Sequence, residues 1–169
     1  VNSDFEFIEL QNIGTQPLEL AGAQLAGGIQ FTFAPLLVAP GGFVLVVNNL
    51  AAFTSRYGAG FDIAGEFSGN LSNSGEQLQL LDSASQVILD FSYQTAWAPA
   101  SDGDGPSLVV INTAAATPSW NSAASWRASR LGGGSPGALD PVATVSARHV
   151  FYNNSKFDGN NAAANAADD

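Results

Sequence analysis

Cysteine is absent from this chain of 169 residues, histidine occurs once, and lysine and arginine together number only 5. Without cysteine the fold can use neither disulfides nor thiolate metal sites, and this fits an exported bacterial protein at least as well as a cytosolic one. The basic residues stand against 15 acidic ones, which gives a formal net charge of -10. This balance argues against binding to nucleic acid and to anionic membrane surfaces, because both need a basic surface.

Long apolar runs are also missing, so the sequence predicts no membrane-spanning helix. No signal peptide or initiator methionine is visible, which leads us to expect a mature or trimmed fragment of an exported precursor. Charged residues make up only 12%, while hydrophobic residues make up 46% and glycine numbers 18. Sparse charge with many turn-forming residues favours an all-β domain, and the length suits one domain with or without an appendage.

Residues 75–93 are the most informative stretch. Leu78 and Leu80 alternate with Gln77 and Gln79, which is the period of a half-buried strand. Small polar residues at 82–85 then predict a tight turn, and apolar residues alternate again over 87–93. A hairpin with one apolar face cannot bury that face alone, so we expect a second sheet to pack against it.

The rest of the chain reads as further short strands and turns. The continuous apolar run at residues 43–47 predicts a strand buried on both faces. Asn48 or Asn49 is expected to cap a short helix over residues 50–57, which Gly58 stops. Residues 113–125 read as a loop. Other strands are predicted over residues 4–12, 17–25 with a break at Gly22, 29–33, 63–67, 108–111 and 142–152.

Several sequence motifs occur in an order that resembles one protein family. They read DFEFIELQN (4–12), PLELAG (17–22), APGGFVLV (39–46), FSGNLSNSGE (67–76), DGDGPSL (102–108), SWRAS (125–129) and GSPG (134–137). Together they resemble a bacterial lamin-tail domain. The resemblance implies an immunoglobulin-like β-sandwich without catalytic activity, found in exported and often multidomain bacterial proteins.

The chain departs from this family pattern at two places. Family members usually carry a strand of the type hydrophobic-Asn-Glu-hydrophobic before the one at residues 4–12, and the departure implies an unpaired sheet edge. An extra segment follows Asp140 and is similar to the start of repeat or anchor regions in exported proteins of planctomycete-like bacteria. We therefore predict a lamin-tail-like β-sandwich with one short helix over residues 1–140, and a C-terminal extension over residues 141–169.

Candidate catalytic groups all have a simpler interpretation. GGSPG at residues 133–137 matches G-x-S-x-G, but proline follows the serine and no helix is predicted after it, so a turn is favoured. Glu6 and Glu9 have opposite strand parity and cannot flank one glycosidic bond, which favours exposed strand charge for them and for Glu19. With His149 as the only histidine, the sequence predicts no catalytic residues and no enzyme.

Two other positions are candidates for ligand binding. Asp102 and Asp104 lie on a glycine-rich loop that suits calcium, although Pro106 and Ser107 break the EF-hand pattern and a solvated turn is the alternative. No other cofactor is predicted. Trp120 lies in a loop rich in small polar residues, where it could stack on a sugar ring or close the end of the core.

The segment from residue 145 to 157 alternates like a strand. It is either a linker to a further domain or a strand that pairs with the open edge of its own sheet or of a neighbouring subunit. The residues expected to make this strand-addition interface are Val145, Ala147, His149, Val150, Phe151 and Tyr152.

Three functions therefore remain open for an extracellular or cell-surface protein. They are a structural or adhesive module within a larger exported protein, a self-assembling filament subunit joined by strand addition of the C-terminal segment, and a carbohydrate-binding module. Its predicted partners are accordingly other domains of that larger protein or further copies of the chain itself.

Overall fold

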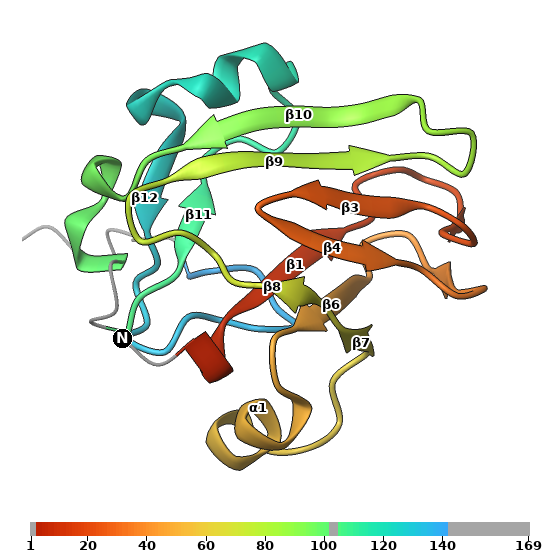
Figure 1. The fold of residues 1–169 in the computed structure, drawn as a ribbon, viewed down its shortest axis with the longest axis horizontal. Helices are drawn as coiled ribbons and strands as arrows, with labels where there is room; N and C mark the ends of the chain where they lie inside the picture. The colour runs from red at the N-terminus through yellow and green to blue at the C-terminus, as the bar shows by residue number, and fades with distance from the viewer. Residues whose placement is uncertain (1–2, 102–104, 142–169) are drawn as a thin grey trace, which may run out of the picture.

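The computed structural model describes residues 3–101 and 105–141. These residues form an all-β, sandwich-like arrangement with one short α-helix among them (Figure 1). The larger sheet has 5 strands and the smaller has 3. In spatial order, the larger sheet comprises β10 (Val87–Tyr93), β9 (Glu76–Leu81), β3 (Gln24–Gly27), β4 (Ile29–Thr32) and β8 (Ser68–Gly69).

The smaller sheet has β6 (Phe43–Val47) at its centre. Strand β1 (Phe7–Gln11) pairs antiparallel with one side of β6, and β7 (Ile63–Glu66) pairs parallel with the other. The remaining strands form two separate two-stranded antiparallel sheets. One pairs β2 (Leu18–Glu19) with β5 (Leu37–Val38), and the other pairs β11 (Leu108–Val110) with β12 (Trp126–Ala128).

Strand β6 is buried on both faces, as its apolar run predicts. Val44 and Val46 contribute to the main core between the two sheets, whereas Leu45 and Val47 pack on the opposite face against Phe53. Burial of each side chain of this size contributes roughly 1.5–3 kcal/mol to the free energy of folding. The smaller sheet is therefore the middle layer of the molecule, with β1 and β6 contributing to both clusters.

Helix α1 (Leu50–Tyr57) covers the outer face of this middle layer, and its predicted bounds are confirmed. The Asn49 side chain accepts the N–H of Ala52 at 2.9 Å. At the other end Gly58 has a φ of 87°, and its N–H bonds the carbonyl of Thr54. The buried Phe53 ring lies edge-on to the Phe7 ring at 5.7 Å, which fixes the helix against β1.

The predicted hairpin is confirmed as β9 and β10. Asp82 accepts the N–H groups of Ala84 and Gln86 across the turn, both at 2.8 Å. One detail of the prediction is wrong, because Val87 does not continue the buried row of Leu89. A β-bulge shifts the register between these two residues, and Val87 is left 58% exposed.

Residues 113–125, predicted as a loop, contain two 3₁₀ helices, η4 (Thr117–Asn121) and η5 (Ala123–Ser125). In Figure 1 this segment lies along the outer side of β10. Strand β12 was not predicted, and the expected first strand starts later because η1 (Ser3–Phe5) precedes it. Helices η2 (Thr95–Trp97) and η3 (Pro99–Ser101) follow β10. Such short elements leave no periodic pattern in a sequence.

Candidate functional site

Strand β1 has an outer edge that is not paired with another strand. The hydrogen bonds at its two ends run from Asn48 N to Glu6 O and from Asn12 N to Gly42 O. The even-numbered residues of this stretch therefore direct their backbone groups toward β6. It follows that the backbone groups of Phe7, Glu9 and Gln11 point away from β6, and they have no backbone partner in the described part of the chain.

The other sheet edges are shorter, irregular or covered. Strand β8 has 2 residues, and the β6–β7 pairing shifts register between Leu45 and Val46. Strand β10 carries the bulge after Val87, and the N–H of Ser92 on its outer side bonds the Asn121 side chain of η4 at 2.7 Å. Bulges, short length and cover are the devices that protect an edge from pairing with another chain. Strand β1 pairs with β6 over 5 residues without a shift, so it is neither short nor bulged, and its outer backbone groups have no backbone partner among the described residues.

Glu9 lies in the outward-facing row of β1. Its carboxylate accepts the N–H of Gly137 in the segment that we call the closing loop (residues 131–140). Burial raises the pKa of Glu9 to about 7, and the hydrogen bond from Gly137 opposes this rise only in part. No Lys or Arg side chain pairs with Glu9 in residues 3–101 and 105–141. The sequence interpretation of Glu9 as exposed strand charge is therefore wrong, because the partner lies 128 positions away.

The closing loop is fixed to the body at several points. The hydroxyl of Tyr57 on α1 donates to the carbonyl of Gly133 at 2.7 Å. Asp140 pairs with Arg127 of β12 and also accepts the N–H of Arg130. Burial alone would raise the pKa of Asp140, but the hydrogen bonds and charge of these arginines lower it. The loop is therefore held by α1, β1 and β12 up to Asp140, which lies one residue before the description ends.

A second group of acidic residues lies where β1 meets the start of β9. Glu6 accepts the N–H of Leu71 at 2.8 Å, and Glu76 accepts the N–H of Ser72 at 2.8 Å and the hydroxyl of Tyr93 at 3.1 Å. Burial raises the pKa of Glu6, and the charge of Glu76 raises it further against the Leu71 hydrogen bond. Burial, followed by Glu76, raises the pKa of Tyr93. The two carboxylates are thus held by loop backbone, and Glu6 and Glu9 serve different loops.

Other carboxylates play the same part elsewhere in the fold. Glu19 accepts the N–H groups of Ala21 and Leu36, both at 3.0 Å, and Glu66 accepts that of Leu50 at 2.6 Å. Together with Glu6, Glu9, Glu76, Asp82 and Asp140, these residues use charge-assisted hydrogen bonds to hold turns and loop ends. Among the residues described, no group of three or more His, Asp or Glu side chains is placed to hold a metal ion.

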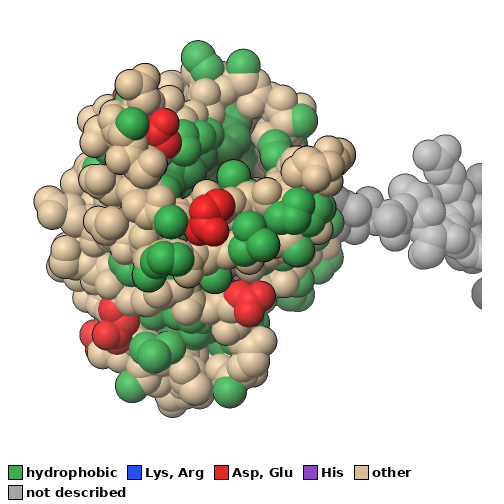
Figure 2. All heavy atoms as spheres, turned by 90° about the vertical axis from the view of Figure 1, so that its right-hand side faces the viewer, with side chains coloured by type: hydrophobic (Ala, Val, Ile, Leu, Met, Phe, Trp, Pro, Cys, Tyr) green, Lys and Arg blue, Asp and Glu red, His purple; other side chains and the backbone are tan. Residues whose placement is uncertain are grey.

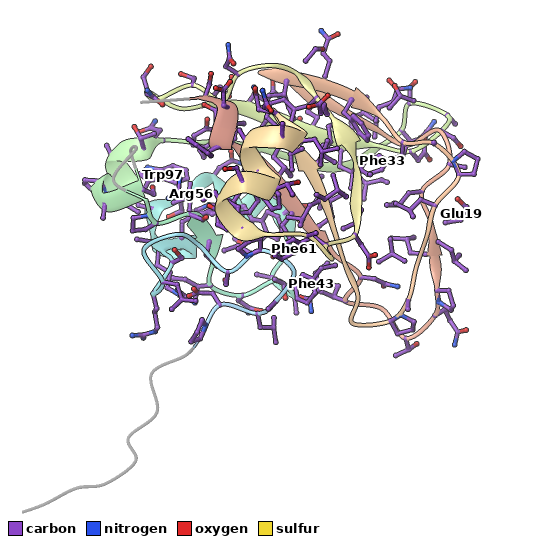
Figure 3. All side chains as sticks on the ribbon, turned by 90° about the horizontal axis from the view of Figure 1, so that it is seen from below. Glu19, Phe33, Phe43, Arg56, Phe61 and Trp97 are labelled. Atoms are coloured by element: carbon purple, nitrogen blue, oxygen red, sulfur yellow. The ribbon has the colours of Figure 1, made fainter. Side chains whose placement is uncertain are left out.

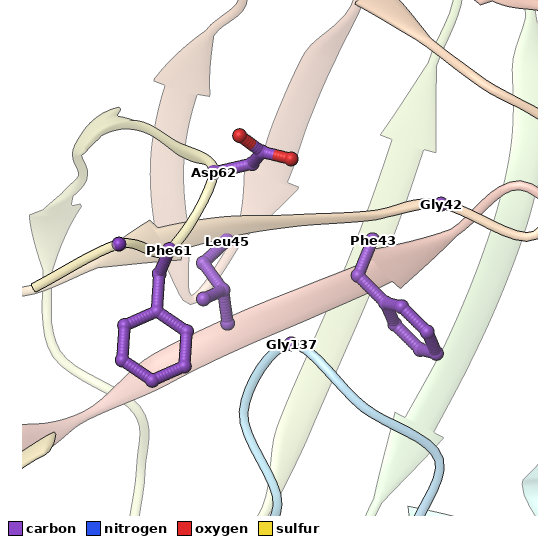
Figure 4. Close-up of a pocket in the computed structure, with 7 residues that line it drawn as sticks. Gly42, Phe43, Leu45, Phe61, Asp62 and Gly137 are labelled. Atoms are coloured by element: carbon purple, nitrogen blue, oxygen red, sulfur yellow. The ribbon is translucent and has the colours of Figure 1, made fainter.

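A hollow of about 370 Å³ lies beside β6, lined by Phe43, Leu45, Phe61, Asp62, Gly137 and two further glycines (Figure 4). Figure 4 shows Phe43 and Phe61 on either side of Leu45, with the closing loop opposite them, while the carboxylate of Asp62 points away. Asp62 is the one acidic residue in this lining. The hollow therefore offers no pair of carboxylates for acid–base chemistry.

Trp120, the predicted sugar-stacking residue, lies in an aromatic cluster on β10. Its ring is edge-on to Phe91 at 5.5 Å and to Trp126 at 5.8 Å. The Trp126 indole donates to the carbonyl of Trp120 at 2.6 Å, whereas the buried Nε1 of Trp120 has no hydrogen-bond partner among the described residues. The cluster holds η4 over the edge of β10, and glycan stacking by Trp120 stays a prediction.

The remaining predicted site residues are not brought together by the described structure. Asp102 and Asp104 lie outside the described residues, as does every predicted interface residue from Val145 to Tyr152. Within GGSPG, the hydroxyl of Ser135 donates to Asp140 at 3.4 Å. Its neighbours Gly134 and Gly137 have φ values of 78° and 75°, which is turn geometry.

Acidic side chains lie near hydrophobic ones on one face of the described molecule (Figure 2). One end of the molecule shows acidic groups among hydrophobic ones, with no Lys or Arg on the face in view (Figure 2). Arg56 lies 5.2 Å above the Phe5 ring and 5.4 Å above the Tyr57 ring, far from Glu19 at the opposite end (Figure 3). Apart from Arg56, the basic residues of the described part are Arg127 in β12 and Arg130, which directly precedes the closing loop.

No family model matches the chain, and a search of curated proteins finds no match either. No helix within residues 3–101 and 105–141 is long and apolar enough to cross a membrane.

Proposed function

We propose that the chain is a non-catalytic structural module of an exported bacterial protein, with an immunoglobulin-like β-sandwich of the lamin-tail type. The observation that carries this proposal is the use of the acidic residues. A carboxyl group that acts as a general acid or base must lie within hydrogen-bond reach of the reacting group of a substrate. The buried or half-buried carboxylates of Glu6, Glu9, Glu76 and Asp140 instead accept backbone N–H groups that fix loops.

The other features that support the proposal are compositional. The acidic, cysteine-free and turn-rich sequence suits an extracellular or cell-surface setting. The partners of such a module would be other domains of a larger exported protein or further copies of the chain.

The test compares carboxylates that hold loops with one that does not. Replacing Glu76 by Ala leaves the Ser72 N–H without its acceptor and removes one of the two acceptors of the Tyr93 hydroxyl, and we expect a loss of about 1–3 kcal/mol in the free energy of unfolding. Asp62→Ala, at an exposed side chain, should cost less than about 0.5 kcal/mol. Urea denaturation measures both. A hydrolytic activity of the full chain on polysaccharides or peptides that Asp62→Asn or Glu9→Gln abolishes would contradict the proposal.

A second candidate function is a filament subunit joined by β-strand addition, and the open edge of β1 favours it. An edge of regular pairing and unused backbone groups is a template for a strand from another chain. Head-to-tail contacts of this kind give open polymers when they do not close into a ring. Negative-stain electron microscopy of the full chain and of a version ending at Asp140 tests it. Filaments are expected from the full chain alone, and dispersed particles from both would exclude it.

A further inference from the structure

The open edge of β1 offers two rows of side chains to an added strand. Ile8 and Leu10 face the main core, whereas Phe7, Glu9 and Gln11 face the layer of α1 and the closing loop. A strand that pairs with this edge continues both rows, because side chains alternate between the faces of a sheet. Its core-facing row must therefore be apolar, and its other row lies beside Glu9.

The segment that we call the C-terminal segment (residues 145–152) has two matching rows. One row consists of Val145, Ala147, His149 and Phe151, and the other of Ser146, Arg148, Val150 and Tyr152. The first row is apolar apart from one imidazole, and it suits the core side with Ile8 and Leu10. The second row then places the cation of Arg148 on the side of Glu9, which is the central residue of β1.

We propose that the C-terminal segment adds to the outer edge of β1 as a further strand, with Arg148 lying beside Glu9. This inference rests on the strand-addition function proposed above, and it adds the orientation of the segment's two faces and the charge pair with Glu9. The added backbone would bond the unused N–H and C=O groups of Phe7, Glu9 and Gln11.

Charge favours this occupant over an unrelated apolar strand. Residues 142–157 contain Arg148, His149 and Lys156 and no acidic residue, in a chain whose formal net charge is -10. Glu9 is half-buried, and among the described residues it accepts a hydrogen bond only from the Gly137 N–H. A guanidinium beside it would supply the counter-charge that this site lacks in the described structure.

The connection is also short enough to deliver the segment. Gly137 of the closing loop already bonds Glu9, and the chain runs from there through residue 141 to Val145. Extended chain covers about 3.3 Å per residue, so the segment can reach the β1 edge of its own copy or of an adjoining copy. The edge of β10 is disfavoured because η4 covers its outer side.

Cysteine pairing in the full chain tests the proposal, because the natural sequence has no cysteine. The Glu9→Cys, Arg148→Cys double variant is treated with a short bismaleimide, and the products are separated by denaturing gel and identified by mass spectrometry. The matched control is Ile88→Cys with Arg148→Cys, because Ile88 is a 49% exposed residue of the β10 edge. We expect a cross-linking yield roughly tenfold above the control, which corresponds to about 1.4 kcal/mol of preference.

Mixing two single-cysteine proteins separates this inference from the filament function. A size-tagged Glu9→Cys protein and an untagged Arg148→Cys protein form a mixed dimer only when the segment crosses between copies. A mixed dimer supports both proposals, whereas a link confined to one copy of the double variant supports the β1 site and excludes the filament. Equal yields at positions 9 and 88 would overturn the β1 site.

Exchanging the charges of residues 9 and 148 provides an independent test, measured by proteolysis of the C-terminal segment. A folding defect would not reproduce the expected recovery in the double variant. Glu9→Arg and Arg148→Glu should each raise the rate of proteolysis within the segment, because each leaves two like charges side by side. The double variant Glu9→Arg, Arg148→Glu should restore protection. Additive effects, with no recovery in the double variant, would overturn the charge pair.

Discussion

Strands β1 and β10 each end a sheet, but their outer backbone groups are treated in opposite ways. On β10, a bulge follows Val87, and Asn121 of η4 takes up the N–H of Ser92. On β1, the pairing with β6 runs without a shift, and the outer groups of Phe7, Glu9 and Gln11 have no backbone partner among the residues described.

The difference shows which edge the chain itself protects. The Phe91–Trp120–Trp126 cluster holds η4 along β10, which is a local device encoded within residues 91–126. Strand β1 packs on the main core through Ile8 and Leu10, while Phe53 and the closing loop contact its opposite face through Phe7 and Glu9. All of these contacts go through side chains of β1. An edge that is rigid on both faces and free along its backbone is suited to receive a strand.

The largest expected effect comes from the support under β1. Phe53 is 0% exposed and packs on Phe7 and Phe61 at 5.7 Å and 5.5 Å. Phe53→Ala should lower the free energy of unfolding by about 3–5 kcal/mol, because it opens a cavity beneath the strand. Phe91→Ala on β10 is the matched control, and we expect a smaller loss since Phe91 is only half-buried. Urea denaturation gives both values, and equal losses would show that the two edges are supported alike.

Blocking the β1 edge is the next test in order of size. The N–H of Gln11 points outward, so Gln11→Pro removes a free donor and obstructs an incoming strand without breaking a β1–β6 hydrogen bond. We expect the rate of tryptic cleavage after Arg148 in the full chain to rise roughly tenfold, or about 1.4 kcal/mol. Asp90→Pro is the control on β10, where the N–H also points outward. Similar rates in the two variants would count against docking at β1.

The layered β architecture could be predicted from the sequence because each element with a clear periodic pattern is present in the structure. The alternation at Leu78 and Leu80, the apolar run of β6 and the caps Asn49 and Gly58 each specify a local structure. The immunoglobulin-like type remains a proposal. Strand β12 and the 3₁₀ helices η4 and η5 were missed because their order depends on aromatic packing against β10 rather than on a repeating pattern.

The candidate site was predictable only in outline. The motif comparison predicts an unpaired edge next to residues 4–12, and the described structure has such an edge on β1. The role of Glu9 could not be predicted, because a strand glutamate gives no sign that a distant loop will cover it and supply the Gly137 N–H. The same holds for Glu6 and the Leu71 N–H, which are 65 positions apart.

The pKa of Glu9 gives a pH-dependent test of the empty β1 edge. Its value of about 7 in the fold lies above the ordinary 4.5, so folding favours the protonated carboxyl. The stability is then fully present below about pH 4.5 and falls as the pH rises through about 7. In an Arg148→Gln background, which removes the proposed ion pair, Glu9→Gln should stabilise the protein by roughly 1 kcal/mol at about pH 8, allowing for solvent screening.

Thermal unfolding between about pH 4 and pH 8 measures this effect. Glu9→Gln should have little influence at the acidic end, where the natural carboxyl is already protonated. Glu19→Gln is the control, because Glu19 likewise accepts backbone N–H groups, from Ala21 and Leu36, but is exposed at the far end of the molecule (Figure 3). A pH profile that Glu9→Gln leaves unchanged would mean that Glu9 is not the group responsible.

The smallest expected effect comes from freeing an outer backbone group of β10, so that this edge resembles that of β1. Asn121→Ala removes the acceptor of the Ser92 N–H, which costs about 0.5–1.5 kcal/mol. We expect the amide of Ser92 to exchange with deuterium roughly threefold faster, which corresponds to about 0.65 kcal/mol, near the lower end of that range. The amide of Phe91, which points toward β9, should keep its protection and serves as the internal control. If Ser92 exchanges no faster in the variant, the β10 edge is protected by the aromatic cluster and not by Asn121, and the contrast with β1 then depends on Trp120 and Trp126 alone.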